Sequence, residues 1–243
     1  MNKLIKTYFR YKKAKQLGFF FSRIKNFKLP REIIVNGCKV NLNYPSEEGV
    51  FNDFVSIFLD DVYGLDYFRN YDIKNIVDVG ANIGLFAMAA KIVFPYSEIH
   101  AYEPNQNLTR FLNFNSSSLK FKNFCEAIGA ESRLVKLELL GDSNQTRVEF
   151  CDSGNIHMIS LKKALSRFDG QVDLLKMDCE GAEWDILEDK DTLSAVCNIS
   201  IEYHLWKNKR SHEFSKEIVK SNGFRIIRQI PSTNFGIIVG TRN

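Results

Sequence analysis

The sequence predicts an α/β protein with a mostly parallel sheet, in which one strand near the C-terminus runs antiparallel to the others. Three observations lead to this fold class. A buried strand runs through a glycine turn into a helix at residues 75–93, strand and helix patterns then alternate up to residue 203, and a hairpin pattern follows at 224–241. Alternating strands and helices are typical of parallel sheets with helical crossovers, and a terminal hairpin must reverse one strand.

The first elements are expected to precede the sheet as an N-terminal helix and hairpin extension. Residues 31–43 contain two short β-branched runs around Asn36-Gly37, a dipeptide that strongly favours a hairpin turn. The apolar pattern of residues 51–62 then predicts a helix.

The segment at 75–93 carries the main functional signal. Residues 75–79 have the pattern of a buried strand, and residues 85–93 that of an apolar helix. Gly80 and Gly84 permit backbone dihedral angles and close approaches that a Cβ atom would forbid. Unpaired N–H groups at the start of a helix favour an electron-rich ligand. The segment therefore predicts a nucleotide-cofactor site.

The next predicted strand, at 98–102, is followed by Glu103, nineteen residues after Gly84. An acidic side chain near this offset can accept hydrogen bonds from both ribose hydroxyls of a nucleoside. The spacing Gly80-x-x-x-Gly84 differs from the G-x-G-x-x-G loop that binds a dinucleotide pyrophosphate. A single-nucleoside cofactor, S-adenosylmethionine, therefore fits this combination better than NAD does.

The remaining elements are expected in regular order along the chain. Helices are predicted at 105–115, 161–168, 184–187 and 213–222. Strands are predicted at 123–127, 134–140, 146–150, 172–177, 196–203, 224–230 and 235–241. The sequence contains no internal repeat, low-complexity tract or long linker, so a second independent domain is not expected.

Four motifs between residues 75 and 203 together resemble FkbM-type methyltransferases. They are DVGANIG at 78–84, AYEPN at 101–105, AIG at 127–129 and DLLKMDCEGAEWDIL at 173–187. The resemblance implies a Rossmann-like class I methyltransferase domain at 71–243, behind a basic N-terminal helix, hairpin and cap at 1–70. It also implies transfer of a methyl group from S-adenosylmethionine to a hydroxyl, frequently that of a sugar or a polyketide-like acceptor.

The cofactor site follows from the local pattern and from this resemblance. Asn82 stands where methyltransferases at large carry the middle glycine of their loop, a departure that the FkbM-type pattern tolerates. The residues expected to bind the cofactor are Asp78, Gly80, Asn82, Gly84, Glu103, Ala127, Ile128 and Asp178.

Methyl transfer to a sugar hydroxyl needs a group that accepts the hydroxyl proton. The candidates at the ends of the fourth and fifth strands are Asp178, Glu180, Glu183, Glu202 and His204. His204 shares a strand face with Glu202 and titrates near neutral pH, although a hydrogen-bonding role at the strand end fits it equally well. Asp178, Glu180 and His204 also resemble a site for a hard divalent ion. Hydroxyl binding or an ion pair with Lys176 is the preferred interpretation, and no metal is predicted.

Positive charge is concentrated at the head of the chain. Residues 1–31 hold ten Lys or Arg and no Asp or Glu, within a net charge of +4 for 243 residues. The apolar residues that recur there at helical spacing are Leu17, Phe20, Phe21, Ile24 and Phe27. A basic helix with an aromatic face fits either a lid on the catalytic domain or peripheral contact with the inner membrane surface.

Composition also bounds the partners and the compartment. Residues 32–243 are net negative, whereas a protein that binds nucleic acid needs a basic surface around its site. Enzymes that methylate nucleobase amines usually carry a Pro-Pro-aromatic run after the fourth strand, and none follows the strand at 172–177. The expected acceptor is therefore a small molecule or glycan and not nucleic acid. Five cysteines without a C-x-x-C pair indicate reduced thiols of a cytoplasmic protein. The rival hypotheses are a nicotinamide-dependent oxidoreductase, which the glycine spacing disfavours, and a non-catalytic nucleoside-binding module.

Overall fold

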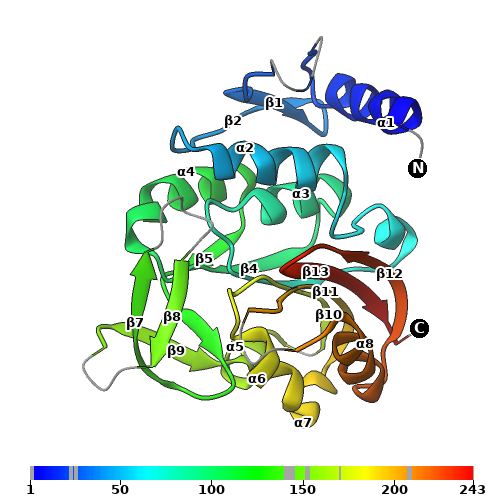
Figure 1. Ribbon diagram of the computed structural model, residues 1–243. Coiled ribbons are helices and arrows are strands. Elements are labelled where there is room, and N and C mark those ends of the chain that lie inside the picture. The colour runs from blue at the N-terminus through cyan, green and yellow to red at the C-terminus, as the bar shows by residue number, and fades with distance from the viewer. Residues whose placement is uncertain are drawn as a thin grey trace.

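The computed structural model describes residues 3–21, 24, 27–139, 146–150, 154–169, 171–206 and 210–242 (Figure 1). Two details of the sequence prediction, the strand end at residue 140 and the thiol of Cys151, lie outside these residues. The described residues form a central seven-stranded sheet of order β12-β13-β11-β10-β3-β4-β5. Its strands are β3 Asn75–Val79, β4 Glu98–Tyr102, β5 Lys122–Phe124, β10 Val172–Met177, β11 Val196–His204, β12 Arg225–Pro231 and β13 Phe235–Thr241.

The register of this sheet brings the ends of its central strands to one edge. Val79 at the end of β3 pairs with Met177 of β10 and with Tyr102 of β4, all in parallel. Met177 also pairs with Ile201 of β11. Only β13 is reversed among the seven strands, because it runs antiparallel to both of its neighbours, β11 and β12. The predicted α/β class, with one antiparallel strand near the C-terminus, is confirmed.

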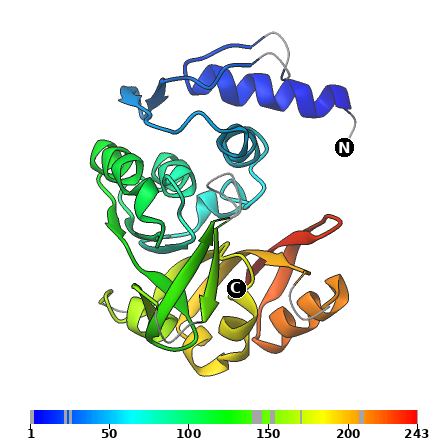
Figure 2. The same ribbon diagram turned by 60° about the vertical axis from the view of Figure 1, so that its left-hand side comes forward.

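Helices cover both faces of the sheet in a three-layer arrangement (Figures 1 and 2). On one face lie α2 Glu48–Phe54, α3 Leu85–Val93 and α4 Thr109–Leu119. On the other face lie α5 Leu161–Leu165, α6 Glu183–Glu188, α7 Lys190–Leu193 and α8 His212–Ser221. Short 3-10 turns occur at η3 Tyr67–Asn70 and η4 Gln106–Leu108, so the helix predicted at 105–115 begins with a 3-10 turn and extends to Leu119.

A second, four-stranded sheet of order β6-β9-β7-β8 was not anticipated from the sequence. Its strands are β6 Ala127–Gly129, β7 Arg133–Leu139, β8 Thr146–Phe150 and β9 Ile156–Ser160. The single strand predicted at 123–127 is therefore wrong, since β5 ends at Phe124 and β6 begins a different sheet. Between them the Glu126 carboxylate binds Arg167 of another segment at 2.6 Å.

The N-terminal segment forms the helix α1 Lys3–Gln16 and the hairpin of β1 Glu32–Val35 with β2 Cys38–Asn41. The helix predicted from the aromatic spacing of residues 17–27 is wrong, because Gly18 follows α1 with a φ of +81° and the chain leaves helical geometry there. Phe19 and Phe27 instead stack on each other against Phe54 of α2. The predicted hairpin with its Asn-Gly turn is confirmed.

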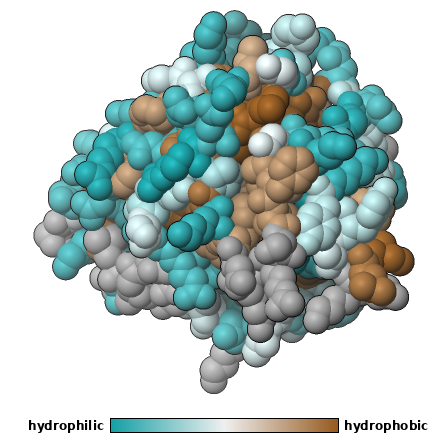
Figure 3. All heavy atoms as spheres, turned by 90° about the horizontal axis from the view of Figure 1, so that it is seen from above, coloured by the Kyte–Doolittle hydropathy of each residue, from teal (hydrophilic) through white to brown (hydrophobic). Residues whose placement is uncertain are grey.

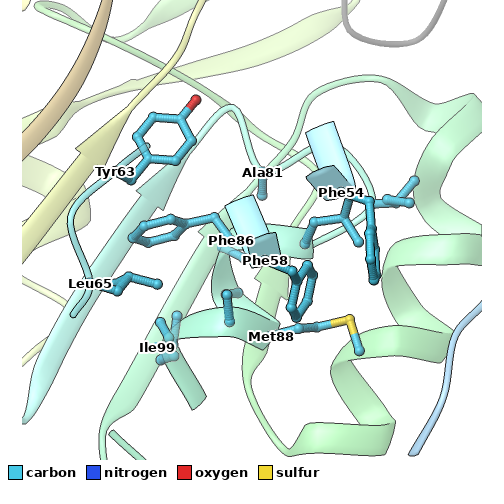
Figure 4. Packing of buried hydrophobic residues seen from close by; sticks show 14 of the residues in the cluster. Phe54, Phe58, Tyr63, Leu65, Ala81, Phe86, Met88 and Ile99 are labelled. Carbon is cyan, nitrogen blue, oxygen red and sulfur yellow. The ribbon is translucent and has the colours of Figure 1, made fainter. Parts of the chain in front are cut away.

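One apolar cluster connects this N-terminal segment to the cofactor half of the sheet. Helix α2 continues as one π-helical turn, η2 Val55–Leu59, so the helix predicted at 51–62 starts earlier and ends earlier. Phe54 stacks on Phe58 at 4.7 Å, and both belong to the same cluster as Phe86 and Met88 of α3 (Figure 4). The N-terminal segment is therefore packed on α3. Among the described residues, no helix has the length and apolarity that crossing a membrane requires.

Candidate functional site

A cavity of about 940 Å³ lies at the edge where β3, β4, β10 and β11 end. Its cofactor side is formed by the turns after β3 and β4 and by the start of β6. Its other side is formed by α2, η2 and the residues after it up to Tyr63, the turn after β10, the end of β11 and the β12–β13 hairpin. Of the residues expected to bind the cofactor, those that line the cavity are Gly80, Asn82, Glu103, Ala127, Ile128 and Asp178.

The turn after β3 needs glycine for two reasons. Gly80 has a φ of +71°, which is strained for other residues, and a Cβ atom on it would overlap the carbonyl oxygen of Asp178. The Asp178 N–H in turn donates to the Val79 carbonyl at 3.0 Å. Two neighbouring strands thus meet backbone to backbone beneath the turn. Gly84 is also left-handed, but it starts α3 against Phe121, so its role is structural.

Lys176 and Asp78 form a buried ion pair below this turn. The Lys176 ammonium lies 3.2 Å from the Asp78 carboxylate and donates to the Gly80 carbonyl at 2.7 Å. Burial raises the pKa of Asp78. Burial also favours neutral Lys176, but the charges of Asp78 and Asp178 outweigh this effect and raise its pKa, so the ammonium stays charged. Asp78, expected to contact the cofactor, instead anchors the lysine that fixes the loop.

Glu103 is buried at the end of β4 with both carboxylate oxygens directed at backbone N–H groups. One oxygen accepts from Asn82 and the other from Asn105, each at 2.8 Å. Each oxygen keeps a second lone pair for a ribose hydroxyl. Burial raises the pKa of Glu103 to about 7, and the two N–H groups offset only part of that rise.

We expect the raised pKa of Glu103 to make cofactor affinity dependent on pH. We expect S-adenosylmethionine to bind more tightly as the pH rises through about 7, because only the ionised Glu103 carboxylate accepts hydrogen bonds from both ribose hydroxyls. Below that pH, binding must release a proton. Calorimetric titrations in two buffers of different ionisation enthalpy measure this release directly.

The variant Glu103→Gln keeps the shape of the side chain but has no charge. We expect it to bind the cofactor about tenfold more weakly and to lose the pH dependence, since hydrogen bonds to a charged acceptor are the stronger ones. Glu131→Gln, at an exposed carboxylate that does not line the cavity, is the matched control. Cofactor binding that is independent of pH in the unmodified protein would contradict this role of Glu103.

The predicted catalytic residues come together opposite the cofactor side. One nitrogen of His204, Nε2, lies 3.6 Å from Glu180 and 3.8 Å from Glu202. Its other nitrogen, Nδ1, lies 3.2 Å from the fully buried carboxylate of Glu183. Ligand atoms of Asp178, Glu180 and His204 lie within 4.8 Å of one another, an arrangement that can bind a divalent ion or several hydroxyl groups.

Charge on these groups differs from what the residue types suggest. Burial would lower the pKa of His204, but the hydrogen bond and charge of Glu183 outweigh it and raise this pKa to about 10. Burial and the negative charge of Asp178 raise the pKa of Glu202 to about 8. With a pKa of about 10, the His204 imidazole is protonated at neutral pH. His204 can therefore serve as the predicted base only after a bound group has offset the carboxylates around it.

Tyr63 is a site residue that the sequence analysis did not identify. Its hydroxyl oxygen lies 3.1 Å from Asp178 and 3.0 Å from Glu202, and its ring packs edge-on against Phe86. Figure 4 shows the hydroxyl pointing away from the apolar cluster. A hydroxyl has one proton to donate, so contact with both carboxyl groups requires a second proton, and the raised pKa of Glu202 places it there. No local motif around Tyr63 signals this contact.

Comparisons with known proteins identify the family of this chain. Residues 78–226 match the family model described as Methyltransferase FkbM domain. The chain belongs to the FkbM methyltransferase family. Methyltransferase 1 of Beauveria bassiana is 27% identical to it over 206 residues, which cover 72% of this chain and 81% of that protein.

Solved structures place this FkbM methyltransferase in the class I methyltransferase fold. Magnesium protoporphyrin IX methyltransferase of Synechocystis PCC 6803, with bound S-adenosylmethionine, aligns with a TM-score of 0.50 at 11% identity, covering 83% of this chain and 87% of that one. The fibrillarin pre-rRNA processing protein of Methanococcus jannaschii aligns with a TM-score of 0.50 at 12% identity, covering 90% and 84%. At these identities the similarity concerns the fold alone.

The cavity of the FkbM methyltransferase fits S-adenosylmethionine, the cofactor of the family. Gly80 and Asn82 of the turn after β3 line the cavity, and Glu103 offers two acceptors to a ribose. The cavity volume of about 940 Å³ lies near the upper end of the usual ligand-pocket range, so it can hold the cofactor and an acceptor together.

Proposed function

We propose that this methyltransferase transfers the methyl group to a hydroxyl oxygen of a sugar, a small glycan or a polyketide-like acceptor. The proposal rests on the side chains that line the cavity opposite its cofactor side. There Tyr63, the carboxyl groups of Asp178, Glu180 and Glu202, and the His204 imidazole all face one cavity. Acceptor and donor groups at hydrogen-bond spacing suit a ligand with several hydroxyl groups, and the excess of carboxylates disfavours phosphate-rich ligands.

When bound, S-adenosylmethionine supplies an electrophilic methyl group on a sulfonium. The protein's part is to hold the acceptor oxygen in line and to take up its proton. In our proposal Asp178 and Glu180 position the acceptor through its hydroxyl groups. The hydroxyl proton passes to the Asp178 carboxylate, which carries no proton in the Glu202–Tyr63–Asp178 network, while the neighbouring His204 imidazolium stabilises charge on the oxygen.

The charge of the cavity and the state of the cysteines also bear on the partners and the cellular compartment of the enzyme. Its carboxylate-rich wall supports a neutral or cationic acceptor over nucleic acid, whose phosphates it would repel. Cys38, Cys125, Cys179 and Cys197 are free thiols, in keeping with a cytoplasmic protein. We propose a cytoplasmic enzyme whose basic N-terminal helix contacts the inner membrane surface.

A methyl-transfer assay with labelled S-adenosylmethionine and a panel of hydroxylated acceptors tests this function. We expect a methyl ether as the product, and we expect Tyr63→Phe to lower kcat/KM about tenfold because it removes a hydrogen bond to a charged group. Tyr67→Phe, at an exposed tyrosine of the same segment, is the matched control. Cofactor binding without transfer to any hydroxyl would favour the non-catalytic module, and an N-methylated product would overturn the O-methyltransferase proposal.

A further inference from the structure

The outward face of α1 is an exposed surface that the catalytic site does not use. Leu4, Ile5 and Tyr8 are 77%, 48% and 65% exposed. Lys12 and Lys15 are exposed as well, and all five positions fall within about 100° of arc on an ideal helix. Figure 3 looks down on this side of the molecule, where apolar patches lie among hydrophilic residues.

The opposite face of α1 fixes the helix on the rest of the protein. Arg10 binds Asp60 through two hydrogen bonds of 2.6 Å, Lys13 lies 2.8 Å from Asp66, and Ala14 is fully buried. Because these contacts set the rotation of the helix, Leu4, Ile5 and Tyr8 cannot turn inward. The apolar side chains remain outside.

The charge of residues 1–31 indicates which kind of partner this surface binds. Residues 1–31 hold ten of the 33 Lys and Arg residues and none of the 29 acids. Of these cations, Lys6, Arg10 and Lys13 pair with Asp60 and Asp66 on the inward side of α1, and Lys12 and Lys15 lie exposed on the outward face. A helix with apolar and aromatic side chains beside lysines is suited to the headgroup region of an anionic bilayer, where the lysines meet negative lipids and the apolar groups insert.

The mouth of the catalytic cavity lies beside the same helix. Lys6 of α1 lines the cavity, and its side chain is 45% exposed. Trp206, Ile230 and Phe235 also line it and are 42%, 37% and 37% exposed, so this end of the cavity reaches the surface between apolar side chains. A helix is about 10–12 Å across, so Lys6 at the mouth lies about one helix diameter from the outward face.

We propose that α1 docks the enzyme on an anionic membrane surface and that the acceptor is the hydroxylated head group of a lipid-anchored molecule. The acceptor part rests on the O-methyltransferase function proposed above. When the outward face of α1 lies on the membrane, the cavity mouth is at the level of the head-group region of the bilayer. The half-exposed Trp206, Ile230 and Phe235 then contact the apolar part of the acceptor next to its head group.

Vesicle flotation of the full chain tests the docking. We expect binding to vesicles of phosphatidylcholine mixed with phosphatidylglycerol and much weaker binding to phosphatidylcholine alone. The variant Lys12→Glu/Lys15→Glu should bind the mixed vesicles at least about tenfold more weakly, as should Leu4→Ser/Tyr8→Ser. The control Lys162→Glu/Lys163→Glu makes the same charge change on exposed positions of α5, on the other side of the sheet. Equal binding by the α1 variants and this control would overturn the docking surface.

Fluorescence tests the placement of the mouth. Trp184 is fully buried, so phosphatidylcholine with a nitroxide on its head group in the mixed vesicles should quench mainly the emission of Trp206, and Trp206→Phe should remove that quenching. Vesicle binding without quenching would show that the mouth faces away from the bilayer, which overturns the lipid-anchored acceptor. Calorimetric binding of S-adenosylmethionine, measured in parallel, separates these outcomes from failure of the proposed function, because it involves neither vesicle nor acceptor.

Discussion

Replacement of Gly80 by alanine is expected to abolish tight binding of S-adenosylmethionine and to destabilise the fold by about 3 kcal/mol or more. The new Cβ atom would overlap the backbone carbonyl of Asp178, which cannot move without separating β3 from β10. The positive φ of +71° adds strain of about 1–2 kcal/mol for a residue with a side chain. Urea unfolding and calorimetric titration with the cofactor measure the two effects.

Gly37→Ala is a matched control for this experiment. Gly37 has a φ of +80°, close to that of Gly80, but a Cβ atom on it would meet nothing within 4 Å. It should cost only the backbone strain, about 1–2 kcal/mol, and leave cofactor binding unchanged. Equal losses of stability in the two variants would show that the close approach to Asp178 does not constrain the turn.

Lys176→Met is expected to lower the free energy of unfolding by about 3–5 kcal/mol, because it leaves the Asp78 carboxylate buried without its counter-ion. The substitution also removes the donor to the Gly80 carbonyl, so cofactor affinity should fall. Without the lysine the pKa of Asp78 rises further above its unfolded value. The loss of stability caused by the unpaired Asp78 carboxylate is therefore small at low pH and grows as the pH rises. Unfolding measurements at about pH 5 and about pH 8 should show this difference.

The double variant Asp78→Asn/Lys176→Met separates the ion pair from simple packing. With the buried charge gone, most of the lost stability should return, since a paired charge and its neutral replacement differ little in a folded core. Cofactor affinity should stay low, because the Gly80 carbonyl still lacks its donor. If the double variant is as unstable as Lys176→Met alone, an unpaired Asp78 is not the cause of the loss.

Local sequence patterns predicted most of the central sheet. The strand at 75–79, the glycine turn and the helix at 85–93 depend on neighbouring residues, and their expected bounds agree with the structure. The second sheet escaped prediction because its order depends on pairings between distant strands, such as β6 with β9. The N-terminal helix was misplaced because the aromatic spacing continues beyond Gly18, where the backbone itself turns out of the helix.

In the candidate site, too, local patterns identified some residues, and contacts between distant segments determined the others. Glu103 was assigned from its offset to Gly84, and the strand ends indicated Glu202 and His204. Tyr63 could not be assigned in this way, because it reaches Asp178 and Glu202 across more than a hundred residues of chain. The raised pKa values of Glu202 and His204 likewise come from burial and from neighbours that only the folded chain brings together.

The two sides of the cavity come from different stretches of the chain. The cofactor side is built by the turns after β3 and β4, whereas much of the opposite side comes from α2, η2 and the β12–β13 hairpin. In the function proposed here, acceptor preference and cofactor binding can therefore diverge independently during evolution. We expect substitutions at residues 52–63 or 230–235 to change the acceptor while cofactor binding by the turns after β3 and β4 is retained.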